Sequence, residues 1–354
     1  MTLSWYLTKA YLTRFFALLV GLVVFLQMLD LLANADAVLD GGGAPVGSLA
    51  RYIIFRVPSI VETVAPLAGL LGALTTLVVL ARNSEIIAMR AAGRSVLSLI
   101  GGLVVVGLML AVVLFFFSDR VVVRFNAQLE DWKSAGYKPG GEIIDGSEAW
   151  VIEGETIVRV GHVLRNGAVL NDIRVFHQTE SDAIADIVNI RLAIWEDAAW
   201  NLFEFERVGG DGGADDTPAW VTKLTPDDFN KLANPPSELT FDELEHYVRE
   251  LALGTRPEYY YDTWLQRKLA GPVVLALMPL LAAIAAFAHH RQGSTVMVVV
   301  YGITLGFVFI VTDNMLLAMG QFGALPPIVA AWLPLALFAT IGLWIVVNLE
   351  NEGA

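Results

Sequence analysis

Six long apolar stretches, three on each side of a strongly acidic middle segment, limit what this chain can fold into. They occupy residues 15–32, 61–80, 96–118, 269–288, 296–319 and 328–347. Each is long enough to cross the hydrocarbon core of a bilayer, about 30 Å thick, as an α-helix rising about 1.5 Å per residue. Because the bilayer offers no water to unpaired backbone groups, such segments must be helical. The sequence therefore predicts an α-helical membrane protein with six transmembrane helices in a 3+3 arrangement.

The charged residues are divided unevenly between the spans and the segment that separates them. Residues 119–262 carry 28 Asp and Glu against 13 Lys and Arg, in a chain of net charge −13. Nucleic-acid binding requires basic surface, so this balance argues against it. The chain has no cysteine, which excludes disulfides and cysteine-bound metals. It also lacks a GxxxxGK[ST] phosphate loop and a GxSxG nucleophile motif. We therefore expect no nucleotide hydrolysis, catalytic site, cofactor or metal in this chain.

Lysines and arginines in the short loops predict how the chain crosses the membrane. Six lie before the first stretch, between the second and third, or between the fourth and fifth: Lys9, Arg14, Arg82, Arg90, Arg94 and Arg291. The short loops of the other side contain only Arg51 and Arg56. This bias places both termini in the cytoplasm and the acidic insert outside it. A cleavable signal peptide ending near Ala33 and Ala35 is the competing interpretation, although cleavage would disrupt the 3+3 arrangement.

A short segment between the second and third stretches reads S-E-I-I-A-M-R-A-A-G at residues 84–93. Ser84 suits an N-cap, Glu85 complements the positive end of a helix dipole, and Gly93 can end a helix. These signals predict a two-turn helix over residues 84–92, too short and too charged to span the membrane. A short amphipathic helix presented to the cytoplasm can fit a groove on a partner. An ordinary capped turn between two spans is the alternative.

Three acidic residues lie in or at the ends of the apolar stretches. Asp30 ends the first, Glu62 opens the second, and Asp313 lies well inside the fifth. The first two can reach the membrane interface and be solvated there. An ionisable group near mid-membrane is costly and normally faces a bundle interior or a wet cavity. Asp313 is therefore either an interhelix pin or part of a pathway, and the two roles are compatible.

The insert has the sequence pattern of short β-strands. From residue 142 to 205, apolar residues alternate with polar ones or form short runs separated by turn signals, which predicts an antiparallel sandwich or open roll. Thr240 and Glu243 form a capping box at the start of a later helix. The predicted domains are residues 1–118 with three transmembrane helices and the short helix, 119–262 with the β-rich insert, and 263–354 with the last three transmembrane helices.

Several motifs along this plan match a known family. Besides residues 84–93, they are L-L-G-A-L at residues 70–74, G-F-V-F at 306–309 followed by Asp313, and P-P with A-W-L-P between 326 and 334. Together with the 3+3 spans and the β-rich insert, they resemble the LptF/LptG (YjgP/YjgQ) permeases of lipopolysaccharide export. The similarity covers essentially the whole chain. The motifs in spans five and six look more like the LptG member than its LptF paralogue.

This resemblance implies a half-permease in the inner membrane of a diderm bacterium. It would pair with an LptF-type partner and sit on a cytoplasmic ATPase dimer of the LptB type, where ATP is hydrolysed. Spans one and five would line an outward-open cavity with lateral gates. The insert, a periplasmic β-jellyroll in this family, would pass lipopolysaccharide to bridge proteins of the LptC and LptA type. The short helix would dock in the ATPase, with Glu85 as a key contact, through Ser84, Glu85, Ile86, Ile87, Met89 and Arg90.

The chain departs from the family pattern at the outer end of span one. LptG relatives often carry lysines there, suited to lipid phosphates, whereas residues 27–34 of this chain contain no base. Arg51 and Arg56 are the nearest substitutes, which implies different headgroup contacts. Two other functions stay open, a permease half for another lipid or a lipoprotein, and a non-transporting membrane scaffold. The residues predicted for the substrate cavity or gate are Asp30, Arg51, Arg56, Glu62 and Asp313.

Overall fold

The computed structural model describes most of the chain. The described residues are 3–138, 148–153, 156–165, 167–178, 184–208, 220, 222, 224–226, 228–229, 236, 239–246, 248, 257–288 and 295–351. Residues 142–147 of the predicted β-rich segment and Arg291 lie outside this set. The chain divides into two compact units. The first comprises Met1–Ala35, Ile53–Phe125 and Thr263–Ala354, and the second Asp36–Tyr52 and Asn126–Asp262.

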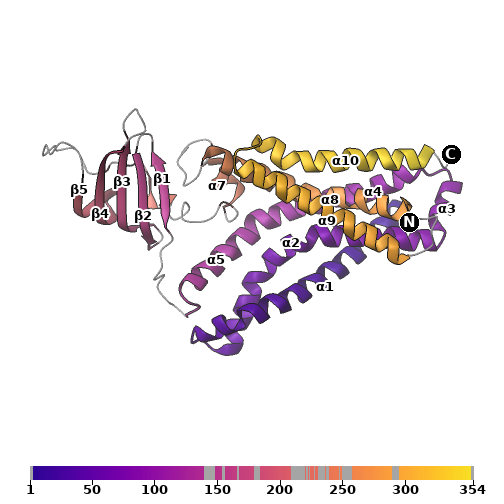
Figure 1. Ribbon diagram of the computed structural model, residues 1–354. Helices are drawn as coiled ribbons and strands as arrows, with labels where there is room; N and C mark the ends of the chain where they lie inside the picture. Colours follow the sequence, from indigo (N-terminus) through magenta and orange to yellow (C-terminus); the bar gives the residue numbers. More distant parts are fainter. Residues whose placement is uncertain are drawn as a thin grey trace. The chain divides into compact units, whose positions relative to one another are not determined.

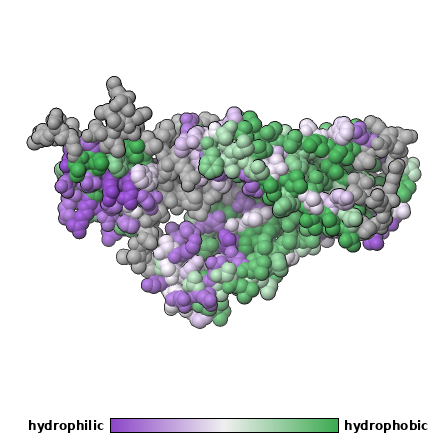
Figure 2. Space-filling view, viewed as in Figure 1, coloured by the Kyte–Doolittle hydropathy of each residue, from purple (hydrophilic) through white to green (hydrophobic). Residues whose placement is uncertain are grey.

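Six long helices account for the six apolar stretches (Figure 1). Each is long and apolar enough to cross a membrane, as Figure 2 illustrates by the largely hydrophobic surface over these helices. The six predicted spans are therefore confirmed as helices. Their bounds are α1 Leu3–Asp40, α2 Pro45–Arg82, α4 Val96–Phe117, α8 Glu258–Ala288, α9 Thr295–Gln321 and α10 Pro327–Asn351.

Helices α1 and α2 extend well beyond their apolar stretches. Each has 38 residues, which corresponds to about 57 Å of helix, nearly twice the thickness of a hydrocarbon core. Arg51 and Arg56, expected in a loop, consequently lie within α2. Hydropathy marks only the part of a helix that is in contact with lipid, because helical backbone hydrogen bonds form equally well in the flanking polar segments.

The third span also continues as a helix beyond its apolar stretch. A π-helical segment η1, Ser118–Val122, follows α4 and leads into α5, Val123–Ser134. Such π segments are rare and often mark functional positions in helices. Near the end of α5 the Trp132 ring packs edge-on against Tyr137, with ring centroids 5.1 Å apart. The chain is therefore continuously helical from Val96 to Ser134, through α4, η1 and α5.

The core of the helical unit is built around α2 and α8. Leu70, Leu74 and Leu77 of α2 are fully buried. Glycine favours the close approach of α9, because a Cβ atom at Gly302 would lie 2.6 Å from a methyl of Leu74 and displace it, and Gly306 faces Leu70 in the same way. Small residues permit such contacts between membrane helices. In contrast, α1 has only 11% of its most apolar window buried, against 72% for α8.

The insert contains an antiparallel sheet in which the described strands follow one another in chain order. Register aligns Val151, Val158, Val175 and Val188 across four strands, and all four are buried. The predicted strands are confirmed within the described residues, and they form one five-stranded antiparallel sheet. The strands are β1 Ala149–Glu153, β2 Thr156–Leu164, β3 Val169–Gln178, β4 Ile184–Glu196 and β5 Ala199–Val208.

The predicted capping box is present at the start of α7, Phe241–His246. The Thr240 backbone N–H donates to the Glu243 carboxylate at 2.8 Å, and the Glu243 N–H donates to the Thr240 hydroxyl at 3.3 Å. Both bonds satisfy amide groups that have no partner inside the helix. The local sequence signal therefore identified this helix start correctly.

Candidate functional site

The short helix α3, Glu85–Ala91, joins α2 to α4 at the end of the bundle where both chain ends lie (Figure 1). After its last turn Gly93 has φ +80°, and the Arg94 N–H donates to the Met89 carbonyl at 3.0 Å. This is the Schellman termination, which requires a left-handed residue and so favours glycine. The prediction that Gly93 ends the helix is confirmed. At the other end Ser84 directly precedes the helix, with a left-handed φ of +58° instead of the extended backbone of a standard N-cap.

The two faces of α3 have different surroundings. Ile86 is buried in the core of the bundle, and Met89 packs against that core. Ile87 points the other way and is 62% exposed. The side chain of Arg90 lies outside the described part of the chain. Of the residues predicted to contact an ATPase, Ile86 and Met89 therefore anchor the helix, whereas Ile87 is presented outward.

Glu85 connects α3 to the first span. Its carboxylate accepts a hydrogen bond from the Tyr6 hydroxyl of α1 at 3.3 Å and another from the Asn83 side-chain amide at 3.1 Å. Tyr6 was not singled out by the sequence, because a tyrosine 79 positions away carries no local signal for this contact. A displacement of α3 would thus act on α1 as well as on α2 and α4.

The residues predicted for a substrate cavity or gate do not form a single cluster in the described contacts. Asp30 and Arg56 do come together, because the Arg56 guanidinium of α2 donates to the Asp30 carboxylate of α1 at 3.1 Å. Glu62 accepts a hydrogen bond from the hydroxyl of Ser118 in η1. The guanidinium of Arg51 lies over the ring of Trp132, 4.8 Å from its centroid.

Asp313 is held by a cation of the neighbouring helix. Arg267 of α8 donates to its carboxylate at 2.5 Å, and Asp313 is only 4% exposed. The next residue, Lys268, pairs at 3.5 Å with Asp119 of η1, and both side chains are largely buried. Two consecutive cations on α8 therefore hold α9 and η1. This ion pair suits the role of Asp313 as an interhelix pin, and its part in a pathway stays a prediction.

Arg267 and Lys268 are the main site residues that sequence reasoning missed. They directly precede the apolar stretch at 269–288, so a search for apolar windows begins one residue after them. The available signal was one of charge balance. Charges inside a helix bundle normally pair with one another, so Asp313, well inside the fifth stretch, indicated that a base of another helix faces it.

Comparison with known proteins decides the family. The model of the lipopolysaccharide export system permease family LptF/LptG matches residues 5–348. The chain belongs to this family. It is 24% identical to the lipopolysaccharide export system permease protein LptG of Escherichia coli strain K12 over 348 residues, covering 95% of this chain and 96% of the relative. The LptG protein of Haemophilus influenzae is 25% identical over 356 residues, covering 97% and 98%. This LptF/LptG family member is therefore LptG-like, a multi-pass membrane transport component and not an enzyme.

Proposed function

We propose that this chain is the LptG-like half of an ATP-driven permease that extracts lipopolysaccharide from the inner membrane of a diderm bacterium. Its partners are an LptF-type permease half and a cytoplasmic LptB-type ATPase dimer. The observation that carries the proposal is α3, an anchored helix with a solvent-facing Ile87. An apolar side chain held outward on a short helix fits a groove on a partner protein.

The energy of the permease has to reach the spans from outside this chain. The sequence contains no phosphate-binding loop, so the ATPase subunits hydrolyse ATP and push on α3. Ile86 and Met89 transmit the movement of α3 to the bundle core, because both pack there. The hydrogen bond between Glu85 and Tyr6 carries it to α1. The loops rich in Lys and Arg, with both termini, lie in the cytoplasm, and the acidic insert lies in the periplasm.

The lipid path runs along the least buried spans. Helix α1 has 11% and α9 has 28% of the most apolar window buried, and both expose large apolar side chains such as Phe25 and Phe307. Such faces suit a contact with a second permease half and with acyl chains entering laterally. The Asp30–Arg56 pair lies between α1 and α2, where it contributes to the gate. The insert then passes the lipid to bridge proteins of the LptC and LptA type.

The decisive experiment is a gentle detergent pull-down of the tagged chain from its native membrane. Mass spectrometry of the eluate identifies the partners, an ATPase assay measures turnover, and lipid analysis identifies the bound substrate. We expect an ATPase, a second six-span protein and lipopolysaccharide. A single inactive chain would instead support a membrane scaffold, and a different bound lipid or a lipoprotein would redirect the substrate assignment.

Variants of α3 test the docking surface within the same experiment. Ile87→Asp places a charge on a side chain that is not needed for core packing, so we expect loss of the ATPase with retention of the second permease half. Ile87→Leu keeps an apolar surface and is the matched control. Glu85→Lys should also abolish coupling, and Tyr6→Phe separates the loss of the α1 contact from the loss of the carboxylate. Retention of the ATPase by both Ile87→Asp and Glu85→Lys would exclude α3 as the docking helix.

A further inference from the structure

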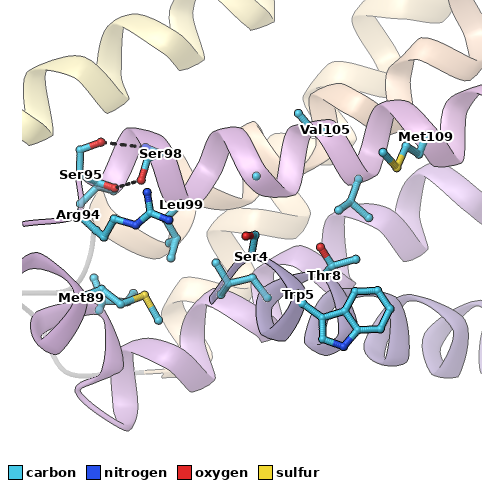
Figure 3. A pocket seen from close by; sticks show the side chains of 15 residues that line it. Ser4, Trp5, Thr8, Met89, Arg94, Ser95, Ser98, Leu99, Val105 and Met109 are labelled. Carbon is cyan, nitrogen blue, oxygen red and sulfur yellow. Dashed lines mark hydrogen bonds between the residues drawn. The ribbon is translucent and has the colours of Figure 1, made fainter. Parts of the chain in front are cut away.

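A cavity of about 410 Å³ lies between the first turns of α1, the inward face of α3 and the first half of α4 (Figure 3). Its volume falls within the range of about 300–1,000 Å³ typical of small-molecule sites. The wall is formed by elements of the helical unit alone, and α3 contributes Ile86 and Met89 to it. Whatever fills this cavity therefore contacts the helix that we propose to couple to the ATPase.

The cavity is amphipathic along its length. One end carries Arg94 with the hydroxyls of Ser95 and Ser98, and the α4 wall continues to Val105 and Met109 (Figure 3). From residue 95 to residue 109 this helix advances about 21 Å. The cavity thus offers a cation and hydroxyl groups at one end, and a mainly apolar channel leads away from them past Ser4 and Thr8 of α1.

Arg94 is exposed, and among the described residues its guanidinium has no carboxylate within ion-pair distance and no hydrogen-bond acceptor. Two described acids at this end of the bundle, Glu85 and Glu350, have other partners. Glu85 accepts from Tyr6 and from the Asn83 side chain. Glu350 accepts from the backbone N–H of Leu97 at 3.2 Å. With respect to the described residues, the charge of Arg94 is therefore available to a ligand.

We propose that this cavity binds a glycerophospholipid with an anionic headgroup, drawn from the leaflet on the α3 side of the membrane. The phosphate contacts Arg94, and one acyl chain lies along α4 towards Met109. Basic pockets between membrane helices on the cytoplasmic side are suited to anionic lipid headgroups. An apolar channel at a bilayer surface favours an acyl chain over water. The identification of this leaflet as cytoplasmic rests on the proposed orientation, whereas the binding chemistry does not.

A bound lipid would stiffen the connection between α3 and the bundle. Ile86 and Met89 reach the cavity from α3, and Trp5 and Leu7 reach it from α1. An acyl chain between them adds apolar contacts to two helices that are otherwise joined here by the Tyr6–Glu85 hydrogen bond. The anionic lipid content of the membrane would then influence how firmly α3 transmits movement to the spans.

Glycine 102 provides a way to fill the cavity without disturbing the fold. Gly102 lines the cavity, and a Cβ atom added there meets no atom within 4 Å. The Cβ atom of Gly102→Leu is therefore accommodated, and we expect the rest of the side chain to take up part of the channel. Gly101 is equally open but does not line the cavity, so Gly101→Leu is the matched control. Both substitutions replace glycine by a good helix former and should not weaken α4.

The test is native mass spectrometry of the delipidated full chain, purified with the partners that accompany it, during titration with dioleoyl phosphatidylglycerol. Dioleoyl phosphatidylcholine is the zwitterionic comparison, and glycerol phosphate is the soluble headgroup. We expect the wild-type chain to prefer phosphatidylglycerol by about fivefold, the contribution of one basic residue near a lipid surface. Arg94→Gln should abolish that preference, and Gly102→Leu should weaken phosphatidylglycerol binding by about tenfold or more. Gly101→Leu should bind like the wild type.

Three results would overturn the lipid site. They are equal binding of the two lipids by the wild-type chain, unchanged binding by Gly102→Leu, and displacement of phosphatidylglycerol by glycerol phosphate. A photo-crosslinker at Met109 that captures a protein chain in native membranes in place of lipid would also overturn it. None of these readouts requires transport, so a failed pull-down of the ATPase would leave this inference intact.

Discussion

In the helical bundle the ion pairs made by Arg267 and Lys268 are largely withdrawn from water, whereas in the sheet of the insert the Arg191–Glu204 pair is immersed in it. The side chains of Arg267 and Asp313 are 24% and 5% exposed, against 75% and 68% for Arg191 and Glu204. The distances are similar, 2.5 and 2.6 Å. The two ion pairs therefore have similar distances but very different exposure to water.

The environment decides what each pair does. In water an ion pair contributes about 0–1 kcal/mol, because solvation of the separate charges competes with their attraction. In a desolvated site the pair is costly to assemble, but the loss of one partner leaves an uncompensated charge and costs about 3–5 kcal/mol. Separating Asp313 from Arg267 is therefore costly as long as this site is shielded from water. The Arg191–Glu204 pair on the sheet, exposed on both sides, should contribute little to stability.

Shared partners distinguish the sheet further. Arg159 lies between Glu148 at 2.6 Å and Asp172 at 3.1 Å, and the hydrogen bond that it donates to the Glu148 carboxylate raises the pKa of this guanidinium. Such a residue stays protonated at any accessible pH.

The largest effect is expected from removing the cation of the most buried carboxylate, Asp313, whose side chain is 5% exposed. Arg267→Leu leaves Asp313 without its cation and should destabilise the bundle by about 3–5 kcal/mol, measured by unfolding in mixed detergent. The double variant Arg267→Leu with Asp313→Leu removes both charges and should recover most of that loss. A double variant as unstable as the single one would show that the pair is not coupled in the way the geometry indicates. For Asp313→Ala we expect transport to be impaired more than membrane insertion.

A smaller loss is expected at the second cation of α8. Lys268→Met removes a pair that is longer, at 3.5 Å, and slightly more exposed at its acid than the Asp313 pair. We expect a destabilisation of about 1–3 kcal/mol in the same unfolding assay. Asp119→Asn should give a comparable loss, and the two changes combined should be less than additive. Fully additive losses would mean that the two residues act independently.

Breaking the partly exposed Asp30–Arg56 pair between α1 and α2 should have an intermediate effect on stability and a larger effect on transport. Arg56→Gln removes the partner of Asp30, and the side chains of Arg56 and Asp30 are 37% and 18% exposed. We expect a destabilisation of about 1 kcal/mol, reduced at high salt. Lipopolysaccharide release in reconstituted vesicles should change more than stability does, because the pair joins the proposed gate helix to α2. Unaltered release would remove this pair from the gate.

The smallest effect is expected on the sheet. Arg191→Gln breaks a pair that is exposed on both sides, so the thermal unfolding of the insert should change by no more than about 0.5 kcal/mol. Val175→Ala in the buried row of the same sheet is the contrasting variant, because it removes two methyl groups from a packed position and should cost about 2 kcal/mol. Comparable effects of the two changes would contradict the distinction between exposed charges and buried packing.

Short-range patterns explain which predictions succeeded. The six spans follow from hydropathy, the strands β1 to β5 from period-two alternation, and the α7 start from the spacing of Thr240 and Glu243. The end of α3 follows from Gly93, because its φ of +80° is readily adopted only by glycine. Each of these features depends on residues that are close together along the chain, so the local sequence is enough to predict it.

Contacts between distant helices could not be read in the same way. The sequence identified Asp313 as a charge that needs a partner, but the choice of Arg267 depends on how α8 and α9 rotate against each other, which glycines such as Gly302 and the buried leucines of α2 determine. The division of α3 into a packed Ile86 and an exposed Ile87 has the same origin. Hydropathy and periodicity determined what this chain forms in a membrane. Packing across the bundle decided which charges meet and which side chains remain outside, because those outcomes depend on the relative rotation and separation of whole helices.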